Sequence, residues 1–143
     1  MRDVMFAAAV ALLAEAAFAQ ASPVGVWKTI DDETRQEKSY VRITESGGAL
    51  SGKVEKVLDS TKQDSKCDKC TDARKDQPVL GMTIIEGLKK NADEAYWYGG
   101  SILDPNNGKP YRVRLTHKDG GKVLEVRGFI GPFYRNQTWL RVE

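Results

Sequence analysis

Two cysteines separated by two residues, Cys67 and Cys70, are the side chains of this sequence best suited to chemistry. Such a pair can form a structural disulfide, cycle as a redox-active thiol pair, or supply two ligands to zinc. Zinc needs two further soft ligands, and the sequence has no other cysteine and a single histidine. A redox pair needs a thioredoxin-like βαβ setting, which the pattern does not supply. We therefore expect a structural disulfide and no metal or cofactor, with a redox pair, a metal site or free thiols as the alternatives.

The acidic run Asp31-Asp32-Glu33 is a second candidate for chemistry, because paired carboxylates can act in hydrolysis or hold a metal. It follows a predicted strand and opens a polar stretch that continues to residue 38. That setting favours a solvated loop, with a polar rim at the mouth of a barrel as the variant. No nucleophile and base can be paired from the sequence, so we expect a protein that is not an enzyme.

Aromatic residues with polar handles are the third candidate, for binding and not for catalysis. In a barrel such side chains can line a small cavity, with a few fixed polar groups beside them. The alternative for an eight-stranded barrel is a structural role, in which the same side chains fill the core. The predicted lining consists of Tyr96, Trp97, Tyr111, Arg127, Gln137 and Trp139.

Short segments with a period of two residues must position these candidates. Polar and apolar side chains alternate within each segment, and Gly, Asn, Asp and Pro separate the segments, which is typical of half-buried strands joined by tight turns. Short connections force neighbouring strands to pair antiparallel, and closing the sheet removes exposed edges. We predict an all-β, antiparallel up-and-down barrel of about eight strands, with a flattened sandwich as the alternative. The expected strands span residues 24–30, 39–45, 50–57, 79–85, 95–103, 110–116, 122–130 and 135–142.

The polar stretch 59–77 interrupts this pattern and contains Cys67 and Cys70. It is dense in Lys, Asp and Ser and has no apolar periodicity, so it is predicted to be a long exposed loop. The formal net charge of the whole chain is only +2. Because no stretch combines dense Lys and Arg with aromatic residues, nucleic acid is not an expected partner.

The first nineteen residues are typical of a cleavable signal peptide. An apolar run from Val4 to Ala14 precedes Ala17-Phe18-Ala19, which offers the small residues that a signal peptidase needs. The run is too short to span a bilayer, and no later stretch is long and apolar enough to do so. We predict export to the bacterial periplasm, with secretion as the second choice, and a single β-barrel domain over residues 20–143.

Several spaced motifs carry a resemblance that covers nearly the whole exported part. They are Gly25-x-Trp27, Gly99-Gly100-x-Ile102-x-Asp104-Pro105, Asn107-Gly108-x-x-Tyr111, Leu124-x-Val126-Arg127-Gly128 and Arg135-x-Gln137-x-Trp139-x-Arg141. In combination they resemble the domain of unknown function 2147 family of small exported bacterial proteins, which the Cys-x-x-Cys pair also fits. The resemblance implies an exported lipocalin-like barrel and supplies no activity, substrate or catalytic residue.

A more distant similarity concerns the calycins, which begin their first strand with Gly-x-Trp and carry a cation near the end of the last strand. In them the Trp closes one end of the barrel and the cation lies over its indole ring. Gly25, Trp27 and Arg141 stand at the corresponding places here. We expect Trp27 and Arg141 to form such a plug, with Arg127 or Arg135 as alternative partners. The other alternative is an ordinary buried Trp and a surface Arg.

These expectations lead to three functional hypotheses. The first is a non-enzymatic barrel that binds a small apolar or amphipathic molecule in the cell envelope. The second is a solid-core interaction protein that docks onto an envelope protein through the loop around Cys67 and Cys70. The third is a thiol redox protein that uses the same two cysteines.

Overall fold

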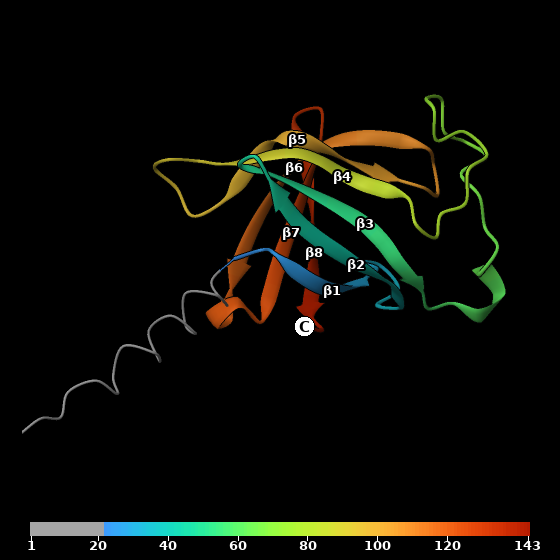
Figure 1. Ribbon diagram of the computed structural model, residues 1–143, viewed down its shortest axis with the longest axis horizontal. Coiled ribbons are helices and arrows are strands. Elements are labelled where there is room, and N and C mark those ends of the chain that lie inside the picture. Colours follow the sequence, from blue (N-terminus) through green and yellow to red (C-terminus); the bar gives the residue numbers. More distant parts are fainter. Residues whose placement is uncertain (1–21) are drawn as a thin grey trace, which may run out of the picture.

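The computed structural model describes residues 22–143, which form one closed antiparallel barrel of eight strands (Figure 1). The predicted signal peptide lies outside the described residues. Each strand pairs with its neighbours in chain order, and short 3-10 turns stand at Ser60–Lys62 (η1) and Asp119–Gly121 (η2). The strands are β1 (Gly25–Ile30), β2 (Glu37–Ser46), β3 (Ala49–Val57), β4 (Thr83–Lys90), β5 (Trp97–Asp104), β6 (Lys109–Lys118), β7 (Val123–Ile130) and β8 (Phe133–Arg141).

The first and last strands close the barrel. Trp27 pairs with Arg141, and Lys28 pairs with Leu140, in antiparallel register. This pairing closes the sheet, so that every strand has a paired neighbour on each side. The predicted up-and-down barrel is therefore confirmed, and the flattened sandwich is excluded.

Alternation within the strands builds the core, as the pattern predicts. In β6, Val113 and Leu115 are buried, whereas Arg112 on the opposite face is exposed. In β7, Leu124 and Val126 are buried in the same way. Apolar residues on one face of each strand thus meet inside the barrel, where their burial drives folding.

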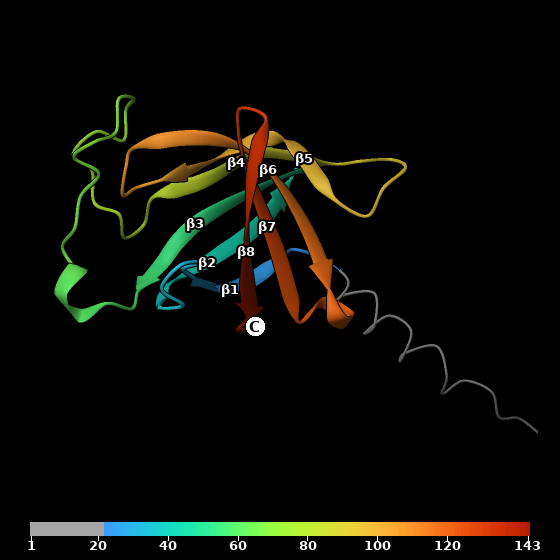
Figure 2. The same cartoon turned by 180° about the vertical axis from the view of Figure 1, so that it is seen from behind.

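Antiparallel pairing divides the connections between two ends of the barrel. The loops that follow β1, β3, β5 and β7 lie at one end, which we call the loop end. The remaining connections and both ends of the described chain lie at the other, which we call the terminal end. Figures 1 and 2 show the long connection between β3 and β4 extending from the loop end.

This long connection differs from its prediction in two ways. The strand expected from residue 79 begins only at Thr83, because Val79 accepts a turn hydrogen bond from Met82 and Gly81 has a positive φ of 87°. Most side chains of 59–77 are exposed, as expected. The expectation of exposure is wrong for Cys67 and Cys70, which are 0% and 2% exposed because the loop folds back onto the barrel.

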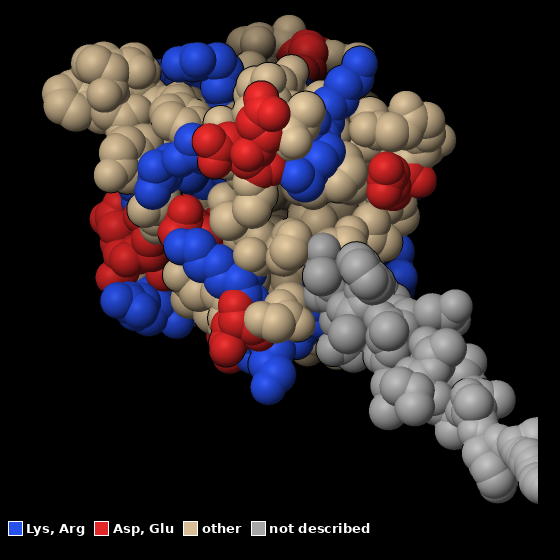
Figure 3. Space-filling view, turned by 90° about the vertical axis from the view of Figure 1, so that its left-hand side faces the viewer, with Lys and Arg blue, Asp and Glu red and all other residues tan. Residues whose placement is uncertain are grey.

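The surface carries mixed charge. On the face shown in Figure 3, basic and acidic side chains are interspersed, which is typical of a solvated surface. Within residues 22–143, no helix has the length and apolar character needed to cross a membrane.

Candidate binding cavity

A cavity of about 960 Å³ enters the barrel from the loop end. This volume lies in the range of small-molecule sites, about 300–1,000 Å³. Its mouth is formed by residues 31–33, by much of 59–69 and by 104–107, so the long connection is part of its wall. The apolar part of its lining consists of Ile30, Val54, Val57, Val79, Ile84, Ile102, Val126, Ile130 and Trp139. The interior of this barrel is therefore not completely filled by its own side chains.

A few polar groups stand among these apolar walls. The hydroxyls of Thr29 and Ser39 lie 2.8 Å apart on the paired strands β1 and β2, and Asn107 donates a 2.8 Å hydrogen bond to the Tyr111 hydroxyl. Each group is positioned by a neighbour and retains a further hydrogen-bonding capacity, since a hydroxyl both donates and accepts. The cavity can thus offer fixed polar contacts to a bound molecule.

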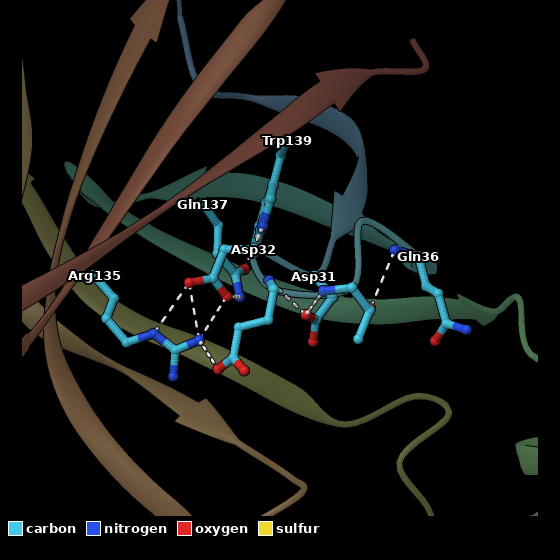
Figure 4. A network of polar contacts seen from close by, with 8 residues as sticks. Asp31, Asp32, Gln36, Arg135, Gln137 and Trp139 are labelled. Carbon is cyan, nitrogen blue, oxygen red and sulfur yellow. Dashed lines mark hydrogen bonds and ion pairs between the residues drawn. The ribbon is translucent and has the colours of Figure 1, made fainter.

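One polar chain runs along β8 from the cavity wall to the mouth (Figure 4). Trp139 donates from its indole nitrogen to the Gln137 side-chain oxygen at 2.9 Å, and Gln137 donates to Asp32 at 3.5 Å. Arg135 then binds both carboxylate oxygens of Asp32 at 2.8 to 3.0 Å and Glu33 at 2.8 Å. Residues at alternate positions of a strand share one face, which places these three β8 side chains in line.

The ion pairs at this mouth hold the rim loop in place. Hydrogen bonds to Asp32 raise the pKa of Arg135 above its ordinary value. Asp31 accepts the backbone N–H groups of Thr34 and Glu33 at 2.9 and 2.8 Å. These bonds lower the pKa of Asp31 below its ordinary value. Of the two hypotheses for the acidic run, the structure shows the polar rim of a barrel mouth.

At the terminal end, Trp27 and Arg141 form the predicted plug. The Arg141 guanidinium lies 4.3 Å from the centre of the Trp27 ring, which is fully buried. Arg141 also donates hydrogen bonds to the backbone carbonyls of Ser22, Val24 and Gly121, and burial lowers its pKa from the ordinary value. The Trp27 indole nitrogen donates to the Pro23 carbonyl at 2.7 Å.

The predicted disulfide between Cys67 and Cys70 is present, with 5.4 Å between the two Cα atoms. The backbone of Cys67 donates to Gln77 at 2.9 Å and accepts from Asp76 at 2.8 Å, which closes the tip of the long connection on itself. This tip packs on the β5–β6 turn so closely that a Cβ at Gly108 would collide with the Lys69 carbonyl. The disulfide therefore stiffens a segment that forms part of the cavity mouth.

The predicted lining is brought together only in part. Tyr111, Gln137 and Trp139 line the cavity. Trp97 is buried in the core opposite Leu115 and lies outside the lining.

Two expected lining residues, Tyr96 and Arg127, lie on the outside, and their predicted placement is wrong. Arg127 stacks 4.1 Å from the Tyr134 ring centre and donates to Asn136 at 2.8 Å, because it alternates with inward-facing Val126 on β7. Tyr96 precedes β5 and so lies outside the alternating pattern. The guanidinium of Arg114 lies over its ring.

Sequence reasoning missed the link between Asp32 and Arg135 and the part of 59–69 that forms the mouth. Two features of the sequence indicate the link between Asp32 and Arg135. One is the acidic run, and the other is the inward position of Arg135, two residues before Gln137. Nothing in the alternation of residues indicates the part of 59–69 that forms the mouth, because 59–69 has no periodic pattern.

Together, the closed antiparallel barrel, the plug at one end and the cavity entered from the other define a lipocalin-like barrel. Residues 25–141 match the model of a family described as "Uncharacterized protein conserved in bacteria (DUF2147)", and the chain belongs to this family. The solved structure of protein HP1028 from Helicobacter pylori, described as belonging to the lipocalin family, is similar over 85% of this chain and 84% of that one. Its TM-score is 0.72 at 21% sequence identity, which supports the shared fold. The chain has no significant match among curated proteins.

Proposed function

We propose that this protein is an exported, non-enzymatic barrel that binds a small amphipathic molecule in the bacterial cell envelope. The observation that carries the proposal is the cavity of about 960 Å³, which is plugged at one end by Trp27 and Arg141 and entered from the other. A fold alone does not define a function, so the argument rests on the geometry and chemistry of this cavity.

The distribution of polar groups favours an amphipathic ligand over a purely apolar one. Val54, Val126 and Trp139 give the cavity an apolar wall suited to an alkyl chain or a ring. The mouth is lined by charged and amide side chains, among them Asp32 and Arg135. A molecule with an apolar body and a polar head could bury its body in the cavity while its head stays hydrated at the mouth.

The way in which the charged groups at the mouth are used supports binding without turnover. Arg135 is committed to Asp32 and Glu33, and Asp31 is committed to the backbone of its own turn. Within residues 22–143, no group of three or more His, Cys, Asp or Glu side chains could hold a metal ion. This arrangement favours a binding cavity over a site for acid–base catalysis.

The proposed location rests on the sequence of residues 1–19, which is typical of an export signal. The Cys67–Cys70 disulfide supports it, because disulfides persist in oxidising compartments such as the periplasm.

Quenching of tryptophan fluorescence by 12-bromododecanoic acid tests the proposal. Bromine quenches an indole only at close range, and Trp139 is the tryptophan that lines the cavity. We expect saturable quenching in the unmodified protein, reversed by dodecanoic acid. The quenching should persist in Trp97→Phe and be largely lost in Trp139→Phe. Quenching that never saturates, or that is unchanged in Trp139→Phe, would show that the probe does not enter the cavity.

A further inference from the structure

The turn between β7 and β8 exposes large apolar side chains at the loop end. Phe133 is 72% exposed, Tyr134 53% and Ile130 45%. A two-residue turn, Gly131-Pro132, joins the strands, and Figures 1 and 2 show it projecting beyond the body of the barrel. Exposed apolar groups gathered on one projecting tip make this turn a candidate interaction surface.

Behind this tip, on the outer face of β6 and β7, three arginine guanidinium groups lie over aromatic rings. The guanidinium of Arg112 lies 5.6 Å from the centre of the Phe129 ring, and that of Arg114 lies 4.5 Å from the centre of the Tyr96 ring. Arg127 stacks in the same way on Tyr134, at 4.1 Å. A cation–π contact of this kind holds each guanidinium near a ring while leaving N–H groups free to donate.

These arginines have little acidic compensation. Within the described part of the chain, Arg112 and Arg114 form no ion pair, and Arg127 has only a 3.7 Å contact with Glu125. Glu125 is itself bound by Lys118 at 2.8 Å. The face behind the tip is therefore positively charged and equipped to bind anions.

We propose that this surface docks the protein onto an anionic phospholipid bilayer. We call it the hairpin patch, and it consists of Ile130, Phe133 and Tyr134 at the tip with Arg112, Arg114 and Arg127 behind it. The tip enters the boundary between headgroups and acyl chains, where Tyr134, an aromatic side chain with a polar end, is favoured and Phe133 and Ile130 can bury apolar surface. The arginines bind lipid phosphates, for which the guanidinium fork is well suited.

A bilayer fits this patch better than a second copy of the chain does. A symmetric dimer places the same patch on both partners, so its arginines would face one another. Like charges brought together in this way oppose association. A membrane supplies both the apolar layer for Phe133 and the negative charge for Arg112.

Docking would also bring the cavity to the membrane. Ile130 belongs to the tip and to the cavity lining, and Arg135 lines the mouth two residues after Phe133. A docked barrel therefore holds its mouth near the acyl chains, from which an amphipathic molecule can enter. This last step rests on the proposed function, whereas docking itself does not.

Flotation with lipid vesicles tests the proposal on the purified protein. We expect co-flotation with vesicles of phosphatidylglycerol and phosphatidylcholine, weakened by high salt, and much less with phosphatidylcholine alone. Phe133→Ser should lower the partition coefficient about tenfold, since it removes one large apolar side chain from the bilayer. Arg112→Gln should lower it about fivefold, the worth of one cation near an anionic surface.

Matched controls separate the patch from general stickiness. Leu80→Ser removes an exposed apolar side chain from the long connection, and Lys53→Gln removes an exposed cation from β3. Both should float like the unmodified protein. Equal losses in Phe133→Ser and Leu80→Ser, or no preference for anionic vesicles, would overturn the proposal, as would a stable dimer that does not float.

A cavity-filling variant, Gly128→Phe, makes failure of docking distinguishable from failure of the proposed function. It should lose the bromododecanoic acid signal and still float with anionic vesicles. Loss of flotation in this variant, with the fold retained, would contradict docking through the hairpin patch.

Discussion

Replacement of Trp27 with alanine is expected to lower the free energy of unfolding by about 3–5 kcal/mol, the usual cost of removing a large buried aromatic side chain. Trp27 is fully buried, donates to the Pro23 carbonyl and lies under Arg141. The variant leaves a hole at the terminal end, a buried carbonyl without its donor and a guanidinium without its ring. Urea denaturation followed by circular dichroism measures the loss.

Trp27→Phe provides the matched control. It keeps an aromatic face under Arg141 but cannot donate to Pro23, so the expected loss is smaller, about 1–3 kcal/mol. A loss below about 1 kcal/mol for Trp27→Ala, within the range of ordinary substitutions, would show that the plug does not hold the barrel closed.

Gly128→Phe is expected to weaken binding of 12-bromododecanoic acid by about a hundredfold. Gly128 lines the cavity, and a Cβ built on it meets no atom within 4 Å, so the new ring can point into open space. The ring takes the place of three or four methylene groups of an alkyl chain. At about 0.8 kcal/mol each, their loss corresponds to roughly a hundredfold in affinity. Fluorescence titration measures the change.

Thr138→Phe is the control for this substitution. Thr138 is exposed on β8, so the same ring is added to the outside of the barrel. We expect the affinity of this variant to equal that of the unmodified protein. If Gly128→Phe binds the probe as tightly as Thr138→Phe, the probe occupies some other place than the cavity.

The barrel could be predicted from the sequence because its signals are local. Alternation in 110–116 sets which residues of that segment face inward, and short turns between segments force antiparallel neighbours. The plug could be predicted because Trp27 and Arg141 lie in the first and last strands, and closure makes these strands neighbours.

The binding site was harder to predict because it depends on contacts between distant segments. The segment 122–130 carries apolar residues on both faces, with Phe129 outside and Val126 inside, so pattern alone does not decide where Arg127 points. Whether an eight-stranded barrel is hollow or filled depends on summed side-chain volumes, which alternation does not report. The part of 59–69 that completes the mouth is placed by tertiary packing on the β5–β6 turn.

The most direct test of a ligand-binding cavity is the anomalous scattering of bromine in crystals soaked with 12-bromododecanoic acid. We predict a bromine peak inside the barrel beside Val126 and Trp139, which is absent from crystals of Gly128→Phe. A barrel interior filled by its own side chains, or bromine found only on the outer surface, would contradict the account.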